Sequence, residues 1–138
     1  MDLLPVLSST PYTLTRTLPQ VPFADAVART RAALSGQGFG VLTEIDVRAT
    51  MKAKLGKELQ DYVILGACNP PLAYASLQAE PGVGLLLPCN IVVTADNSGG
   101  SVVAAVDPEA LFSVVQRPDV GGLASEVKAR LQKVLDAI

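Results

Sequence analysis

Two short segments carry the residues most suited to chemistry, and each places a cysteine directly before an asparagine. The first is Cys68-Asn69-Pro70, at the end of an apolar run, and the second is Pro88-Cys89-Asn90, inside another apolar run. Asn69 is a good helix N-cap, and Pro70 suits the first helical position. The dipole of a helix that begins there would favour the thiolate of Cys68, which is the nucleophilic and metal-binding form.

Simpler interpretations exist for both segments. A cysteine at the end of a strand is often a small buried apolar residue, and Asn69 would then be an ordinary cap. Pro88 cannot donate to a strand ladder, so Pro88-Cys89-Asn90 marks either a protected edge or a bulge that redirects side chains. Repetition of the Cys-Asn pair weighs against coincidence, and we expect a ligand-binding site at Cys68, Asn69, Cys89 and Asn90. Of these, Cys68 is also the candidate catalytic residue, as nucleophile or redox thiol.

Other chemistry finds less support in the sequence. The two cysteines could bind a soft metal such as Cu(I) or form a redox pair, but they lack CxxC spacing. The chain has no histidine that could complete the four ligands of a zinc site. We therefore predict no metal site, and the sequence leaves any cofactor open. Glu44 and Asp46 lie two residues apart and could pair for acid/base work, although a solvated strand face with Asp46 as a helix cap is the more ordinary interpretation.

Composition limits the function classes further. The chain has 138 residues, 49% hydrophobic and 17% charged, with a formal net charge of -2 and no histidine. This chain can bury a core as one domain, and it lacks the basic footprint of a nucleic-acid-binding protein. Residues 83–95 form its longest apolar stretch, which Pro88 and Asn90 interrupt and which is too short to span a membrane. With no leader pattern at the first residues, we expect a cytoplasmic protein with free thiols.

The hydrophobic periodicities predict the elements that must position these residues. Residues 1–10 are interpreted as a poorly ordered lead-in and residues 11–138 as a single domain. Alternating and apolar stretches indicate five strands, at residues 12–18, 39–47, 62–68, 84–94 and 101–106. Helical stripes and caps indicate helices at residues 22–35, 48–55, 70–80 and 108–116, with a last one that carries Leu123 to Ile138. Asp107 is expected to cap the helix at 108–116, and residues 96–100 are expected to form the hairpin turn before the last strand.

This alternation predicts an α/β (α+β) fold with a mixed five-stranded sheet packed with helices. Its order is strand-helix-strand-helix-strand-helix-strand-strand-helix-helix. Residues 62–68 and 84–94 lack a polar face, which indicates burial on both sides and central positions in the sheet. Because the helices could cover only one face, the other needs more helices or a partner chain. We therefore expect a homodimer.

The same segments resemble a known family. Residues 64–70 and 80–93, together with Thr43-Glu44-Ile45-Asp46-Val47 and Ala105-Val106-Asp107-Pro108, are similar to the bacterial and archaeal domain of unknown function 302. The resemblance extends from about Tyr12 to Leu135. It implies a compact α/β fold that is compatible with a dimer, and it brings no established activity.

Three functions remain open at this level. The favoured one is a small-ligand-binding homodimer with its site near the two Cys-Asn segments. A thiol-dependent or redox enzyme that uses Cys68 is one alternative, and a structural or interaction module is the other.

Overall fold

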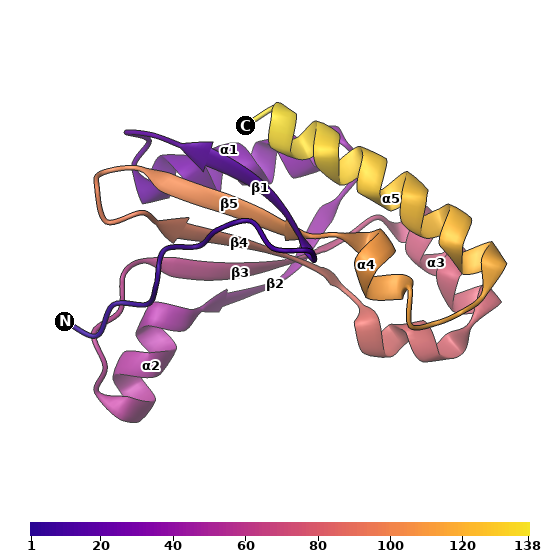
Figure 1. Cartoon of the computed structure of the whole chain (residues 1–138), viewed down its shortest axis with the longest axis horizontal. Helices are drawn as coiled ribbons and strands as arrows, with labels where there is room; N and C mark the ends of the chain where they lie inside the picture. Colours follow the sequence, from indigo (N-terminus) through magenta and orange to yellow (C-terminus); the bar gives the residue numbers. More distant parts are fainter.

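The computed structural model describes residues 1–138 and contains one five-stranded sheet (Figure 1). Its strands run in the spatial order β1-β5-β4-β3-β2, and every neighbouring pair is antiparallel. The strands are β1 (Thr13–Leu18), β2 (Gly40–Asp46), β3 (Tyr62–Cys68), β4 (Cys89–Ala95) and β5 (Ser101–Val106). The expected central positions of the two most apolar strands are confirmed, since β4 lies in the middle of the sheet and β3 beside it.

Five α-helices and one short 3₁₀ helix accompany the sheet. They are α1 (Phe23–Gly36), α2 (Val47–Leu55), α3 (Pro70–Ala79), η1 (Pro81–Leu86), α4 (Pro108–Phe112) and α5 (Pro118–Asp136). The predicted order of strands and helices is confirmed. None of these helices is both long enough and apolar enough to cross a membrane.

The sheet is wholly antiparallel, so the expectation of a mixed sheet was wrong. Parallel neighbours need a crossover that carries the chain back over a face of the sheet. Here α1 crosses one face and leads from β1 at one edge to β2 at the other, which are not neighbours. Both α2 and the α3–η1 pair instead lie at the ends of the sheet and return the chain antiparallel to the strand it has just left (Figure 1).

The fourth strand is also shorter than predicted. Residues 84–86 belong to η1, and β4 begins only at Cys89, after a cis Leu87–Pro88 bond. The Glu80 side chain accepts a hydrogen bond from the Gly82 backbone N–H and caps η1. Pro88 has no N–H to add to the ladder. An unbroken apolar run does not distinguish a buried strand from another buried element, which explains the error.

One face of the sheet packs against α1 and α5 and forms the main core. Alternate strand residues point into this core, and the long helix α5 contributes a stripe of buried residues at helical spacing. Fully buried members include Leu34 of α1, Leu65 of β3, Ile91 of β4, Val103 of β5 and Leu131 of α5.

The opposite face, called the open face below, has no helix layer. The strand residues on it alternate with those of the core and include Ile64, Asn90, Val92, Val102 and Ala104. Residues 1–10 contain no helix or strand and run along this side of the molecule. Hydrogen bonds hold this segment in place. The Asp2 N–H donates to the Glu58 carbonyl at 2.9 Å, the Leu4 N–H donates to Gln60 Oε1 at 2.9 Å, and the hydroxyls of Ser9 and Thr15 are hydrogen bonded at 2.8 Å.

The predicted helix caps and turn are confirmed. Asp46 accepts from Ala49 N–H at the start of α2, Asn69 from Leu72 N–H at the start of α3, and Asp107 from Glu109 N–H at the start of α4. Asp96 accepts from the backbone N–H groups of Ser98 and Gly100 and closes the β4–β5 hairpin. These local hydrogen bonds fix where each element begins, and so place Asn69 at the N-terminus of α3.

Gly66 gives a first testable prediction. It lies on the open face of β3, where an added Cβ would contact Thr43 Oγ1 and lie 2.7 Å from Pro88 Cγ. We expect Gly66→Ala to lower the free energy of unfolding by about 1–3 kcal/mol because a neighbour must move. Gly121→Ala in α5 is the matched control, since nothing lies within 4 Å of its Cβ. This control should leave stability unchanged or raise it by about 0.5–1 kcal/mol. Urea unfolding measures both, and equal effects of the two substitutions would contradict the packing described.

Candidate functional site

The first predicted segment lines a small cavity on the core side of the sheet. Cys68, Asn69 and Cys89 contribute to its wall together with apolar residues of α3 and α5, among them Leu72, Leu123 and Val127. Its volume is about 30 Å³. A space of this size holds one or two water molecules at most, far below the size of a ligand pocket.

The two cysteines of this cavity differ in exposure. Both are free thiols; Cys89 is buried, with 5% of its surface exposed, whereas Cys68 is partly exposed. Burial, with a smaller contribution from Cys68, raises the pKa of the Cys89 thiol to about 11. Cys89 is therefore held as a neutral thiol at physiological pH.

Asn69 already has a structural role. It is buried, and its side-chain oxygen accepts the Leu72 N–H of α3 at 3.3 Å. The sheet register pairs Cys89 with Ala67, so Cys68 lies one residue beyond the position opposite Cys89. No group of three or more His, Cys, Asp or Glu side chains is arranged to hold a metal ion.

Asn90 is separated from the other three predicted residues. It pairs with Gly66 on the open face, where it is exposed and lines a second, larger hollow. This hollow, called the groove below, has a volume of about 460 Å³. Its walls come from the start of β1, from β3, β4 and β5, from η1, from α4 and from Leu7 of the N-terminal segment. Leu87 and Pro88 line both spaces, so the segment before β4 separates the cavity from the groove.

The groove is apolar except for a few polar groups. Its lining includes Leu86, Val92 and Ala104 and contains no charged residue. Asn90, Tyr12 and Tyr62 all belong to the lining, and neither the Asn90 carboxamide nor either tyrosine hydroxyl is hydrogen bonded to another protein atom. Such a combination of apolar walls and a few convergent polar groups is typical of small-molecule sites.

The two tyrosines were not predicted from the sequence. Partial burial, with a smaller contribution from Tyr12, raises the pKa of the Tyr62 phenol, so the hydroxyl remains a hydrogen-bond donor at physiological pH. Tyr62 lies four residues before Gly66 in β3, so both residues are on the open face. Gly66 is the register partner of Asn90. That spacing is visible in the sequence, but the pairing of Asn90 with Gly66 is not.

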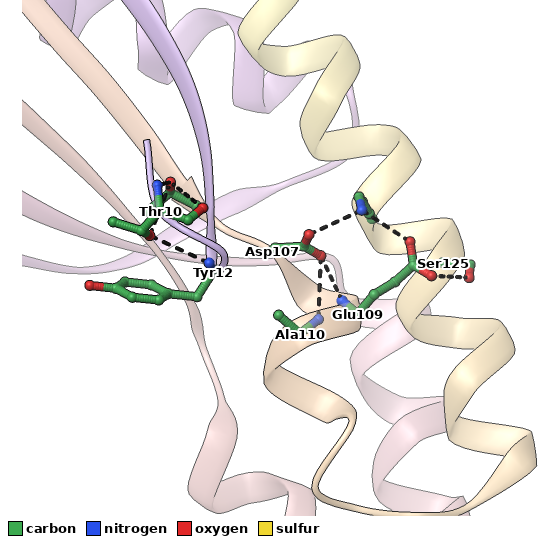
Figure 2. A network of polar contacts seen from close by, with 8 residues as sticks. Thr10, Tyr12, Asp107, Glu109, Ala110 and Ser125 are labelled. Carbon is green, nitrogen blue, oxygen red and sulfur yellow. Dashed lines mark hydrogen bonds and ion pairs between the residues drawn. The ribbon is translucent and has the colours of Figure 1, made fainter. Parts of the chain in front are cut away.

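The short helix α4 lies between the cavity and the groove. Leu111 lines the groove, whereas the next residue, Phe112, lines the cavity. The backbone N–H of Asp107 donates to the Tyr12 carbonyl at 2.8 Å, which ties the start of α4 to the start of β1. Figure 2 shows the Tyr12 side chain extending away from α4 and α5.

A polar cluster fixes α4 against α5 (Figure 2). Asp107 accepts hydrogen bonds from the backbone N–H groups of Glu109 at 2.9 Å and Ala110 at 3.4 Å. Its other oxygen pairs with Lys128 Nζ of α5 at 3.0 Å, and Glu109 lies 3.2 Å from the same ammonium and accepts from Ser125 Oγ at 3.3 Å. The hydrogen bond to Asp107, followed by the one to Glu109, raises the pKa of Lys128. The cluster thus serves as a positioning device for α4.

A third hollow has carboxylates in its wall, but they are all engaged. It lies beside β2 and includes Glu44, Asp46 and Asp61. Glu44 pairs with Arg31 at 2.9 Å, Asp61 pairs with Arg48 at 3.0 Å, and Asp46 caps α2. The ordinary interpretation of Glu44 and Asp46 is therefore confirmed.

Comparison with known proteins finds matches that cover most of the chain. The family model described as domain of unknown function DUF302 matches residues 14–138. A crystal structure of an uncharacterized conserved DUF302 protein from Bacillus stearothermophilus has a TM-score of 0.85 and 28% sequence identity. The match covers 93% of this chain and 98% of that one. No curated protein matches the chain.

The unequal burial of the cysteines generates a second prediction. Single variants Cys89→Ser and Cys68→Ser leave one thiol each, and we expect the thiol of Cys89→Ser to be alkylated at least tenfold faster at pH 7.5. The reason is that Cys68 is partly exposed beside the α3 N-terminus, whereas Cys89 is buried with a pKa of about 11. Iodoacetamide rates from pH 6 to 10 measure this, with denatured samples as controls. Equal rates in the folded variants would contradict the assignment.

Proposed function

The chain belongs to the DUF302 family, and we propose that it is a small-molecule-binding protein whose site is the groove on the open face. The observation that carries the proposal is the groove itself. Its volume of about 460 Å³ is within the roughly 300–1,000 Å³ usual for ligand pockets. The proposed site keeps Asn90 and the segment before β4, as the sequence indicated, and adds Tyr12 and Tyr62.

Asn69 and the cysteines form the back of the site under this proposal. Their cavity, at about 30 Å³, is nearly filled by protein, and it adjoins the groove only through Leu87 and Pro88. The start of β4, which includes Asn90, is then supported by Cys68, Asn69 and Cys89. The ligand contacts Asn90 and not these three residues.

A thiol-dependent enzyme is the second candidate, and one observation favours it. Cys68 is a free, partly exposed thiol next to the capped N-terminus of α3. Its side chain has no hydrogen-bond partner in the protein, so it lacks the adjacent base that activates most nucleophilic thiols. Binding without covalent chemistry is therefore the better supported function.

We further propose that the protein is a homodimer in the cytoplasm. The rim of the open face exposes apolar side chains, with Leu85 at 91%, Tyr12 at 61% and Ile45 at 48%. A second copy packed on this rim would remove them from water and close the groove from outside. The reducing cytoplasm is consistent with two cysteines that are both free.

Filling the groove should weaken ligand binding. Val92 is half-buried in the groove floor, and Val92→Phe places a ring in the space that a ligand would occupy. We expect the affinity for the uncharged fluorescent probe N-phenyl-1-naphthylamine to fall at least tenfold. Thr17→Phe is the matched control, since Thr17 lies on the same face of the sheet but outside the groove. Thermal unfolding checks that both variants are folded; unchanged probe binding in folded Val92→Phe would refute the site.

The dimer has its own test. Sedimentation equilibrium at micromolar concentration should give twice the mass of 14.3 kDa. Ile45→Glu should dissociate the dimer, because a carboxylate would be buried at the interface without a partner. Leu77→Glu on α3, another exposed apolar position, is the control and should remain dimeric. A monomer at every concentration would end the dimer proposal.

A further inference from the structure

We propose that the ligand of the groove is an uncharged, mostly apolar molecule with one carboxamide-like group that Asn90 recognises. This inference rests on the groove being the ligand site, and it names the chemical class that the site accepts. It follows from three properties of the groove: the absence of charge, the free state of one carboxamide and the position of the two phenols.

The absence of charge excludes ionic ligands. No lysine, arginine, aspartate or glutamate lines the groove, so a bound carboxylate, phosphate or ammonium would lose hydration without gaining an opposite charge. The net charge of -2 adds nothing favourable for an anion. Carboxylates are instead concentrated in the hollow beside β2, where they are paired or cap a helix.

Asn90 supplies the specific recognition. Its carboxamide carries two N–H donors and one carbonyl acceptor, and no protein atom is hydrogen bonded to any of them. A ligand amide can donate its N–H to the Asn90 oxygen, and a primary amide, whose N–H and C=O lie on one edge, can also accept from the Asn90 N–H. An ester of the same shape keeps the acceptor but has no N–H, so it cannot donate to the Asn90 oxygen.

The remaining walls define the rest of the ligand. Val92 and Ala104 form an apolar floor next to Asn90, and Leu7 and Leu86 add apolar walls. The hydroxyls of Tyr12 and Tyr62 have no hydrogen-bond partner in the protein, and burial raises the pKa of the Tyr62 phenol, which keeps that hydroxyl a donor. They suit a weak neutral acceptor on the apolar body, such as an ether oxygen or a ring face, because neither offers a charge.

Two matched pairs of probes test the proposal. N-phenyl-1-naphthylamine and its sulfonated analogue 8-anilinonaphthalene-1-sulfonate share one skeleton and differ in charge. We expect the neutral probe to bind at least tenfold more tightly. Benzanilide and phenyl benzoate, an amide and the corresponding ester, are then compared as competitors of the bound neutral probe. The amide should compete roughly fivefold to tenfold better, as expected for one neutral hydrogen bond.

Variants assign the amide preference to one residue. Asn90→Leu keeps the size of the side chain and should make the amide and the ester equal competitors, while the neutral probe still binds. Thr17→Leu, on the same face but outside the groove, should leave the preference unchanged. If the neutral probe does not bind the native protein at all, the proposed function itself fails. If it binds but the sulfonate binds equally, or the ester competes as well as the amide, only the assigned ligand class is wrong.

Discussion

The five-stranded sheet has apolar side chains on both faces, and the chain has helices to cover only one of them. The hydrophobic effect drives α1 and the long α5 onto the first face, where Leu34, Leu65 and Leu131 are fully buried. The second face has no helix layer and leaves Val92 and Ala104 in the lining of the groove, to which the extended N-terminal segment adds only Leu7. The groove is a direct consequence of this imbalance, and so is the apolar rim around it.

The segment before β4 separates the groove from the core. Leu87 and Pro88 stand between the cavity and the groove, and the strand that follows sends Cys89 to the core and Asn90 to the open face. Strand alternation therefore gives adjacent residues opposite surroundings. Cys89 becomes a dry, neutral thiol, whereas the carboxamide of Asn90 is presented to the groove.

The sequence predicted the elements well because their signals are local. Asp46, Asn69 and Asp107 were identified as caps from residue type and position, and each one caps its helix. Strand direction and the start of β4 were not predictable in this way, because an apolar run specifies neither its partner nor its length. For the same reason, Asn90 was predicted to share a site with the cysteines, although the alternation of side chains along β4 places it on the opposite face of the sheet from Cys89. Tyr12 and Tyr62 reach one groove only through a register between strands far apart in the chain.

The central claim is that ligands bind on the open face and not in the cavity of the thiols. A titration of ¹⁵N-labelled protein with N-phenyl-1-naphthylamine, followed by NMR, locates the bound probe most directly. The account predicts that the side-chain amide signals of Asn90 and the backbone signals of Val92 and Ala104 shift together with one dissociation constant. Shifts confined to Cys68, Asn69 and Ala73, which line the cavity, would contradict it.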